Sequence, residues 1–345
     1  MSSESSAYTQ AGVDITAGNR AVRLMRDAVE ATYGREVLQG IGAFGGLYDA
    51  ASVKALAAPV LVASTDGVGT KTMVAAQLER WDTIGRDLVN HCVNDILVQG
   101  ARPLFFLDYV ASSRLDAERI ATIVGGVADG CREAGCALLG GETAEMPGVY
   151  APGEIDLVGT VVGVVARDAI VDGARIRPGD AILGLPSSGL HTNGYSLARR
   201  ALAPLDWTTP RPDLGGSIGD ALLTVHRSYR SHAQRLWDAG VDIRGMAHIT
   251  GGGLIENPPR ILPPGVGAVL WRGAWPEPPI FGLIRQMADI GAEMERVFNM
   301  GLGMLVIVPR SNVVVAQAAL SDEVYHVGEI VAGERGVTIL DQEGG

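Results

Sequence analysis

The sequence predicts a two-domain protein of the α/β or α+β class, and three observations support this prediction. The chain has 345 residues, and at roughly 150 residues per domain that length fits about two domains. Short apolar runs alternate with amphipathic segments in both halves, as strands and helices do in mixed sheets. Residues 173–179, which include Pro178, break the pattern between the halves and predict a linker.

This pattern divides the chain into three parts. Residues 1–18 are polar and show no periodicity, which predicts a mobile N-terminal arm. Residues 19–172 then form the first domain, and residues 173–345 form the second.

In the first half, the elements follow one another with clear boundaries. Residues 19–33 place apolar and charged side chains at helical spacing, and a glycine-dense loop follows at 40–46. Apolar runs predict buried strands, and amphipathic runs predict helices. The predicted strands are 59–65, 104–110, 136–139 and 157–166, and the predicted helices are 83–98 and 116–134.

In the second half, the same alternation starts again after the linker. A loop at 186–194 separates a strand from a helix that runs through Arg200, and a loop at 250–253 precedes a helix that starts at Leu254. The other predicted elements are strands 181–185, 245–249, 267–270, 304–308, 324–331 and 337–340, and helices 219–239 and 312–321.

Composition excludes several classes of function. Hydrophobic residues make up 47% of the chain and charged residues 19%, so apolar surface suffices for folded cores. The net charge of −11 argues against nucleic acid or an anionic membrane as a general partner. No apolar run reaches the ~20 residues of a membrane helix. The N-terminus lacks a secretion-signal pattern, so we expect a cytoplasmic protein with reduced cysteines.

Two glycine-rich loops in the first half are candidate phosphate sites. Gly40, Gly42 and Gly45 match the dinucleotide spacing GxGxxG, but neither a clear strand before them nor a helix after them is predicted. A flexible loop and a phosphate-covering loop therefore stay open beside a nicotinamide or flavin site. The second loop, residues 66–72, follows a strand and contains Lys71, although a tight turn with solvated charges explains it equally well.

Three acidic residues at predicted element ends could supply oxygen ligands for Mg²⁺. They are Asp66, Asp95 and Glu142, and Mg²⁺ usually binds through one or two carboxylates together with phosphate oxygens. Taken singly, each acid is also explained as a helix cap or a turn residue.

Two loops of the second half are further candidates for binding an anion. Residues 186–194 hold small hydroxyls, His191 and Asn193 before a helix, and residues 250–253 hold Gly251 and Gly252 before another. A lone histidine is often structural, and a triple glycine can simply make a sharp turn. Whether these loops bind a ligand or are only structural therefore depends on the residues around them in the fold.

Taken together, these segments resemble the phosphoribosylformylglycinamidine cyclo-ligase (AIR synthetase) family. The resemblance spans nearly the whole chain, and many motifs appear in the family's order. The segments that carry it are 11–15, 65–71, 92–95, 99–101, 104–109, 140–148, 187–197, 248–253 and 298–301.

The resemblance implies ATP-dependent ring closure in purine biosynthesis. Formylglycinamidine ribonucleotide and ATP would give 5-aminoimidazole ribonucleotide, ADP and phosphate, with Mg²⁺ on the phosphates. It also implies a PurM-like fold, in which an N-terminal mixed-sheet domain pairs in a homodimer and a C-terminal α/β sandwich domain follows. Related architectures serve selenophosphate synthetases and thiamine-monophosphate kinases, and a non-enzymatic ATP-sensing module is the alternative from another class.

The resemblance assigns roles to individual positions. His191, Asn193 and Lys71 would be catalytic, and Asp66, Asp95 and Glu142 would hold the metal. The nucleotide-binding residues would be Asp66, Gly67, Gly69, Thr70, Lys71, Gly42, Gly45, Asp95, Gly141, Glu142, Gly251 and Gly252.

Overall fold

The computed structural model describes residues 15–341, so most of the expected N-terminal arm lies outside the described residues. The part inside it corrects the prediction, because residues 15–18 are the first turn of helix α2 (Ile15–Glu30). Ala21, Met25 and Val29 line the buried face of this helix, and their packing outweighs the cost of about 1 kcal/mol for Gly18 in a helix.

The chain forms two compact units. The first contains the described residues up to Ile96 together with 102–167, and the second contains 97–101 and everything from Asp168 onward. Between residues 15 and 341, no helix is long and apolar enough to cross a membrane.

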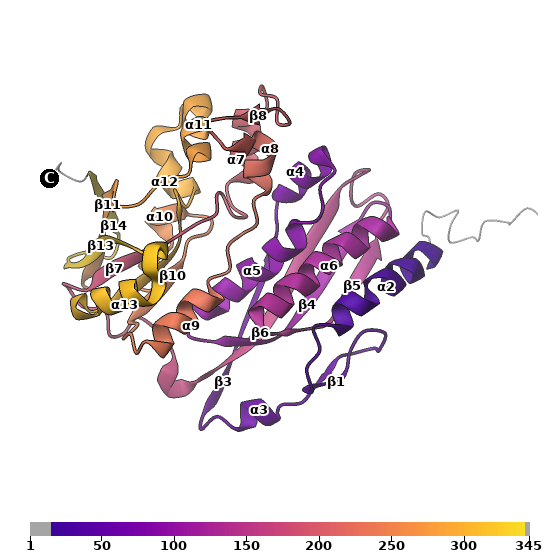
Figure 1. Ribbon diagram of the computed structural model, residues 1–345, viewed down its shortest axis with the longest axis horizontal. Coiled ribbons are helices and arrows are strands. Elements are labelled where there is room, and N and C mark those ends of the chain that lie inside the picture. Colours follow the sequence, from indigo (N-terminus) through magenta and orange to yellow (C-terminus); the bar gives the residue numbers. More distant parts are fainter. Residues whose placement is uncertain (1–14, 342–345) are drawn as a thin grey trace, which may run out of the picture. The chain divides into compact units, whose positions relative to one another are not determined.

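The first unit is a four-stranded sheet covered on one face by helices. Its strands lie in the order β3-β6-β4-β5, with β4 and β5 parallel and the other pairs antiparallel. Figure 1 shows α5 and α6 over this sheet, with α2 beside α6. The elements are β3 (Pro59–Gly67), β4 (Arg102–Ser112), β5 (Ala137–Glu145), β6 (Ile155–Ala166), α5 (Ile84–Leu97) and α6 (Ala117–Ala134).

Two boundaries in this unit follow from local chemistry. Asp116 caps α6 by accepting a hydrogen bond from the Arg119 N–H, and Gly135 ends the helix in the left-handed conformation at φ 73°. Strand β5 continues to Glu145, so Gly141 and Glu142 lie in a strand and not in the turn that the sequence predicts. The parallel partner β4 supplies the ladder that holds these residues extended.

The glycines of β6 face the helices of their own unit. A Cβ on Gly159 would lie 2.2 Å from the Phe106 ring, and one on Gly163 would lie 2.6 Å from Ile96 Cδ1 on α5. Val161 shares this face and is fully buried. The space above these glycines is therefore filled within the unit itself, by Phe106 and by α5, and is not open to a second copy of the chain.

Among residues 15–341, the opposite face of the sheet carries exposed apolar side chains together with the Thr65–Thr160 pair. Leu61 is 63% exposed and Leu107 38% exposed. On β6 the register pairs Leu61 with the buried Val164 and Leu107 with Thr160. An exposed apolar face of this kind is usually buried against another element or another molecule. The hairpin strands β1 (Val37–Gln39) and β2 (Leu47–Tyr48) reach only its margin, where Tyr48 contacts Phe105.

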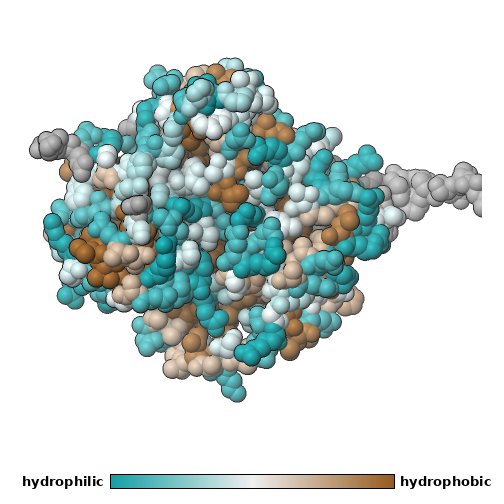
Figure 2. Space-filling view, viewed as in Figure 1, coloured by the Kyte–Doolittle hydropathy of each residue, from teal (hydrophilic) through white to brown (hydrophobic). Residues whose placement is uncertain are grey.

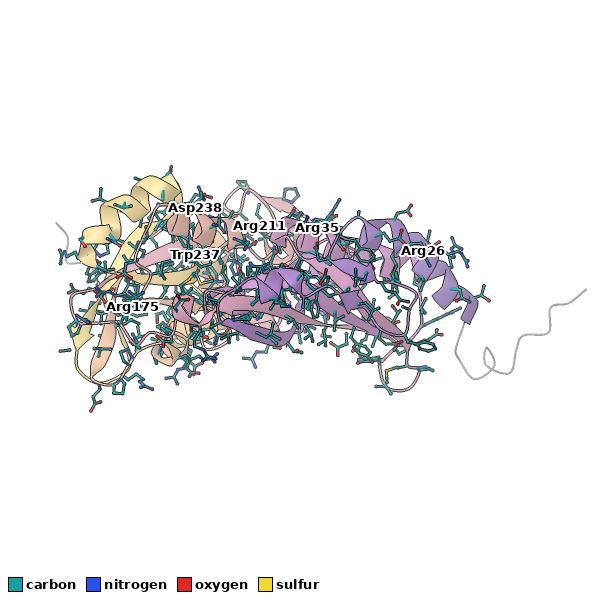
Figure 3. The ribbon with its side chains drawn as sticks, turned by 90° about the horizontal axis from the view of Figure 1, so that it is seen from below. Arg26, Arg35, Arg175, Arg211, Trp237 and Asp238 are labelled. Atoms are coloured by element: carbon teal, nitrogen blue, oxygen red, sulfur yellow. The ribbon has the colours of Figure 1, made fainter. Side chains whose placement is uncertain are left out.

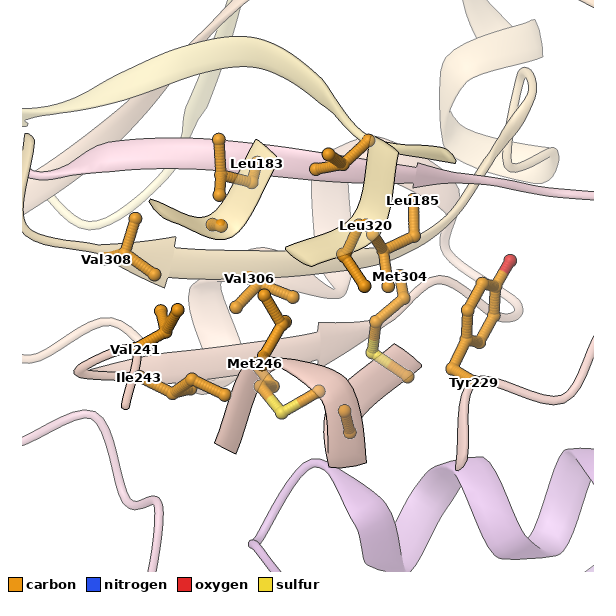
Figure 4. Close-up of a cluster of buried hydrophobic side chains, with 14 of the residues drawn as sticks. Leu183, Leu185, Tyr229, Val241, Ile243, Met246, Met304, Val306, Val308 and Leu320 are labelled. Atoms are coloured by element: carbon orange, nitrogen blue, oxygen red, sulfur yellow. The ribbon is translucent and has the colours of Figure 1, made fainter. Parts of the chain in front are cut away.

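The second unit is built on a six-stranded sheet. Its order is β10-β12-β7-β13-β11-β14, antiparallel except for the pair β11 and β14. Figure 4 shows the buried side chains of this sheet, such as Leu183 and Val306, packed into one cluster. The strands are β7 (Ala181–Pro186), β10 (Gly245–His248), β11 (Val266–Arg272), β12 (Leu302–Val308), β13 (Tyr325–Ala332) and β14 (Val337–Asp341).

Two helices of this unit differ from the prediction. The segment 219–239 divides into α8 (Ile218–Leu223) and α9 (Arg230–Asp238), because the chain between them carries His226 and Tyr229 into the interior. Helix α10 (Gly253–Glu256) has only one turn, since Pro258 and Pro259 follow.

Polar side chains lie on the outer surfaces of α2 and α9. Figure 3 shows Arg26 on the outer side of α2 and Trp237 with Asp238 at the end of α9. On the face seen in Figure 2, hydrophobic side chains appear in small groups among hydrophilic ones.

Candidate functional site

One face of α5 carries a row of three ionisable side chains. Asp87, His91 and Asp95 are spaced four residues apart, so they lie above one another along the helix. Each meets a different residue from β3 or the segment that follows it. The sequence predicted only Asp95 of this row, and the four-residue spacing is the signal that could have found the others.

Lys71 and Asp87 form a fully buried ion pair. The Lys71 Nζ lies 2.7 Å from Asp87 Oδ2, and both side chains are 0% exposed. Burial lowers the pKa of Lys71, while the charge and hydrogen bond of Asp87 oppose that shift. Lys71 lies at the first position of α4 (Lys71–Leu78) and points inward. Its ammonium is thus held by Asp87 in the interior, and the expected contact with a phosphate stays a prediction.

Asp66 and Asp95 are brought together by His91. The His91 Nε2 lies 3.0 Å from Asp66 Oδ2 and 3.9 Å from Asp95 Oδ2. The Ser64 hydroxyl donates to Asp95 at 3.2 Å. Burial acts to lower the pKa of His91, but the hydrogen bond to Asp66 and the charge of Asp95 outweigh it, so the pKa is raised.

This pair of carboxylates fits Mg²⁺. Their side chains are 44% and 26% exposed, so oxygen atoms remain within reach of solvent. Two carboxylates with open positions for phosphate oxygens match the ligands that Mg²⁺ prefers. The buried His91 fixes the orientation of both.

Glu142 does not join this pair. The sheet register aligns Gly67 with Val158, Val158 with Tyr109, and Tyr109 with Glu142. Glu142 therefore lies three strand spacings from the end of β3, about 14 Å at ~4.8 Å per strand. The three-acid cluster expected from the sequence is thus not formed, because the chain crosses two other strands between its members.

The loop after β3 is shaped by its own backbone. The Gly67 N–H donates to Asp66 Oδ1 at 2.7 Å, and Gly69 has φ 65°, a conformation that favours glycine. Thr70 stands at the N-terminal cap of α4. The structure places Gly67, Gly69 and Thr70 beside Asp66, and their contact with phosphates stays a prediction.

A separate pocket brings together other predicted residues. Gly42, Gly141 and Glu142 line one cavity of about 300 Å³ in the first unit, whereas Gly45 is not among its lining residues. Asp108 on β4 also lines it, and the sequence analysis missed this residue. Burial raises the pKa of Asp108 to about 7, which marks it as unusual.

In the second unit, His191 lies in the interior. It is 1% exposed, has φ 63° and stacks on His226 at a centroid distance of 4.0 Å. Its Nε2 accepts hydrogen bonds from the N–H groups of Ser188 and Arg227, at 3.2 and 3.5 Å. The neutral ring must then carry its proton on Nδ1. The left-handed backbone at a non-glycine residue is typical of functional positions.

His226 and His248 complete a buried cluster that the sequence did not predict. Their Nε2 atoms lie 3.1 Å apart, and the Thr192 hydroxyl lies 3.2 Å from His226 Nδ1. The three histidines could be considered for a metal ion by proximity. His191 does not fit that role, because its Nε2 is occupied by backbone donors and its Nδ1 carries the proton.

Asn193 lies next to the glycine loop of the second unit. A Cβ on Gly251 would lie 3.5 Å from Asn193 Oδ1. The Asn257 side chain holds that loop through Nδ2 bonds to the Thr250, Gly251 and Gly253 carbonyls, at 3.3, 3.3 and 2.9 Å. Asn193 and Gly251 are thus brought together, as expected of one site, whereas Gly252 (φ 101°) makes the turn.

Family models match most of the chain. The model described as "AIR synthase related protein, N-terminal domain" matches residues 48–165, and its C-terminal counterpart matches 177–341. A protein from Desulfitobacterium hafniense (strain DSM 10664 / DCB-2), named phosphoribosylformylglycinamidine cyclo-ligase, is 51% identical over 338 residues, 97% of this chain and 99% of the relative. A Gloeobacter violaceus protein of the same name is 51% identical over 330 residues, 94% and 97% of the two chains.

Solved structures support the fold. The chain resembles HypE in complex with ATP with a TM-score of 0.66 and 21% identity, covering 97% of this chain and 95% of the other. It resembles thiamine-monophosphate kinase from Stenotrophomonas maltophilia K279a with a TM-score of 0.66 and 18% identity, covering 92% and 95%. These likenesses confirm the expected PurM-like fold.

Proposed function

Because the chain belongs to the phosphoribosylformylglycinamidine cyclo-ligase family, we propose that it converts formylglycinamidine ribonucleotide and ATP into 5-aminoimidazole ribonucleotide, ADP and phosphate. The observation that carries this proposal is 51% identity over 97% of the chain to a protein with that activity in its name. The Asp66–His91–Asp95 arrangement supports it, since phosphoryl transfer needs a site for charged phosphates. We expect the enzyme to act in the cytoplasm, as a purine biosynthetic reaction implies.

The chemistry explains why ATP is needed. An amide oxygen is a poor leaving group, so the formyl oxygen first takes the γ-phosphoryl group. The amidine nitrogen then attacks the formyl carbon and closes the ring. The bond between that carbon and the phosphorylated oxygen breaks, which releases phosphate. Holding both reacting groups in one site makes the closure effectively intramolecular.

The residues of this chain would do three things. Asp66 and Asp95 would hold Mg²⁺, which when bound neutralises charge on the phosphates. The Asp87–Lys71 pair fixes α5 against α4, and so keeps His91 and Asp95 in place. In the second unit, Asn193 and the Gly251 loop would bind the ribonucleotide, with the Nδ1–H of His191 as a hydrogen-bond donor nearby.

The activity is tested by phosphate release. We expect phosphate to appear from ATP only when formylglycinamidine ribonucleotide and Mg²⁺ are both present, in a one-to-one ratio with the aminoimidazole product. Equal ATP turnover with thiamine monophosphate would instead indicate that the chain has the activity of the thiamine-monophosphate kinases.

We also infer a homodimer that forms through the uncovered face of the four-stranded sheet. Changing Leu61 to Asp should give a monomer, because Leu61 is 63% exposed and a buried charge there would be unpaired. Light scattering at low micromolar concentration measures the mass. A Val161→Asp variant on the neighbouring strand would not test the dimer, because Val161 is buried within its own protomer. A wild-type chain of 36.1 kDa that is fully active as a monomer would refute the dimer.

His191 and Asn193 should differ in their effects. Asn193→Ala should lower turnover with little change in melting temperature, because Asn193 is only partly buried and its Nδ2 has no hydrogen-bond partner among the described residues. His191→Ala should lower turnover more than Asn193→Ala, and should also lower the melting temperature because its stacked ring is buried. Normal catalysis in a destabilised His191→Ala variant would make this histidine purely structural.

A further inference from the structure

Glu323 joins parts of the second unit that are far apart along the chain. It ends the short turn that follows α13 (Val313–Leu320). Its Oε1 accepts a hydrogen bond from Arg227 Nη2 at 3.1 Å, and its Oε2 accepts one from Arg235 Nη2, on α9, at 2.7 Å. The bond from Arg235 holds the pKa of the Glu323 carboxyl below its ordinary value, so the carboxylate is ionised at neutral pH. Each oxygen therefore holds a different arginine.

Arg227 belongs to a segment that has no regular structure of its own. Residues 224–229, between α8 and α9, form neither helix nor strand. The backbone groups of such a segment depend on partners outside it. The Arg227 side chain anchors the segment in two directions, because Nη1 donates to the Pro186 carbonyl at 3.1 Å while Nη2 donates to Glu323. The segment is thereby attached to the end of β7, where the loop that carries His191 begins.

The backbone of Arg227 contacts His191 directly. Its N–H donates to His191 Nε2 at 3.5 Å, beside the Ser188 N–H at 3.2 Å. The Ser188 hydroxyl in turn donates to the Val225 carbonyl at 2.5 Å, so both donors depend on the segment 224–229. The neutral ring keeps its proton on Nδ1 while Nε2 is occupied as an acceptor. The position of Arg227 therefore influences which ring nitrogen donates.

We propose that Glu323 is a positioning residue for His191 and that it acts through Arg227. The inference rests on the proposed function, because it concerns the Nδ1–H that His191 offers near the ribonucleotide. Without the carboxylate, the Arg227 guanidinium keeps only one of these two anchors, and the backbone N–H that it positions shifts away from Nε2. Nε2 then takes the proton in part of the molecules, and those molecules lose the Nδ1–H donor.

The kinetic test uses Glu323→Gln, which keeps the shape of the side chain and removes its charge. We expect kcat for phosphate release to fall about 3–10-fold, the worth of one partly exposed hydrogen bond to a charged group. The KM for ATP should change less than about twofold. Glu323→Asp keeps the charge and should recover at least about half of the lost kcat. A normal kcat with a lowered melting temperature in Glu323→Gln would overturn the proposal.

Nitrogen NMR tests the positioning without any turnover. In protein labelled with ¹⁵N-histidine, the ring signals of His191 are assigned by their loss in His191→Gln. The wild type should show one protonated and one unprotonated nitrogen in this ring. In Glu323→Gln the two chemical shifts should move toward each other, because the two tautomers mix. Unchanged shifts would show that Glu323 does not act on His191.

Two further variants separate positioning from stability. Glu277→Gln breaks the Arg285–Glu277 pair, whose carboxylate is 35% exposed against 39% for Glu323, and should leave kcat and the His191 signals at their wild-type values. Arg235→Gln breaks the other bond of Glu323 and should lower the melting temperature while kcat stays within about twofold.

Equal losses of kcat in Arg235→Gln and Glu323→Gln would mean that Glu323 acts only by holding α9 in place, which contradicts the proposal. If the wild type releases no phosphate with formylglycinamidine ribonucleotide, the proposed function fails. The NMR comparison of Glu323→Gln with the wild type still decides the positioning in that case, since it requires no substrate.

Discussion

Replacing Asp87 with Asn should lower the free energy of unfolding by about 3–5 kcal/mol, the usual cost of breaking a buried ion pair on one side. The change removes the opposite charge that lies 2.7 Å from the Lys71 ammonium, which is 0% exposed. The low dielectric of the interior makes that charge expensive. Urea unfolding followed by circular dichroism measures the loss.

A double variant separates charge from packing. Lys71→Met combined with Asp87→Leu removes both charges and should recover most of the lost stability, because apolar pairs often replace buried ion pairs without penalty. If Asp87→Asn costs less than about 1 kcal/mol, the pair is not a buried ion pair in solution. Turnover by a stable double variant would show in addition that Lys71 makes no essential phosphate contact.

Replacing Asp95 with Asn should reduce turnover by about 10²–10³-fold, in the range found when one group that stabilises transition-state charge is removed. Asn keeps an oxygen that can accept from Ser64, so the fold should persist. The measurement is kcat with saturating ATP and Mg²⁺, alongside the melting temperature. Asp129→Asn on α6 is the matched control, since it removes a half-exposed carboxylate that pairs only locally, with Arg132 on the same helix, and lies outside the site.

A kcat within about threefold of the wild-type value would show that Asp95 is not a metal ligand. A large fall in melting temperature would instead assign Asp95 a structural role through Ser64 and His91. The metal dependence distinguishes these cases further. We expect Asp95→Asn to need more Mg²⁺ for half-maximal rate, because one carboxylate ligand is lost.

Much of the fold was predictable because its signals are local. Apolar runs gave the strands around Val62 and Val161, and Gly135 marked the end of α6. The end of β5 was missed, because Gly141 and Glu142 look like a turn until β4 supplies a parallel partner. The break between α8 and α9 depends on burial of His226 and Tyr229, which sequence spacing does not show.

The site was only partly predictable for a similar reason. Sequence motifs identified Asp66, which follows an apolar strand, and Asp95, which interrupts an otherwise apolar helix. They could not show that Lys71 turns inward to Asp87, or that Glu142 is separated by two strands. Asp108 lies in segment 104–109, which contributes to the family resemblance, but a single acid inside an apolar strand indicates no role until the cavity around it is seen.

The account depends most on phosphorylation of the formyl oxygen, and oxygen-18 tests that step directly. Substrate labelled at the formyl oxygen is converted with unlabelled ATP, and the released phosphate is analysed by mass spectrometry. Phosphate that carries one labelled oxygen per ring closed is the predicted result. Unlabelled phosphate, with the label lost to water, would contradict the account.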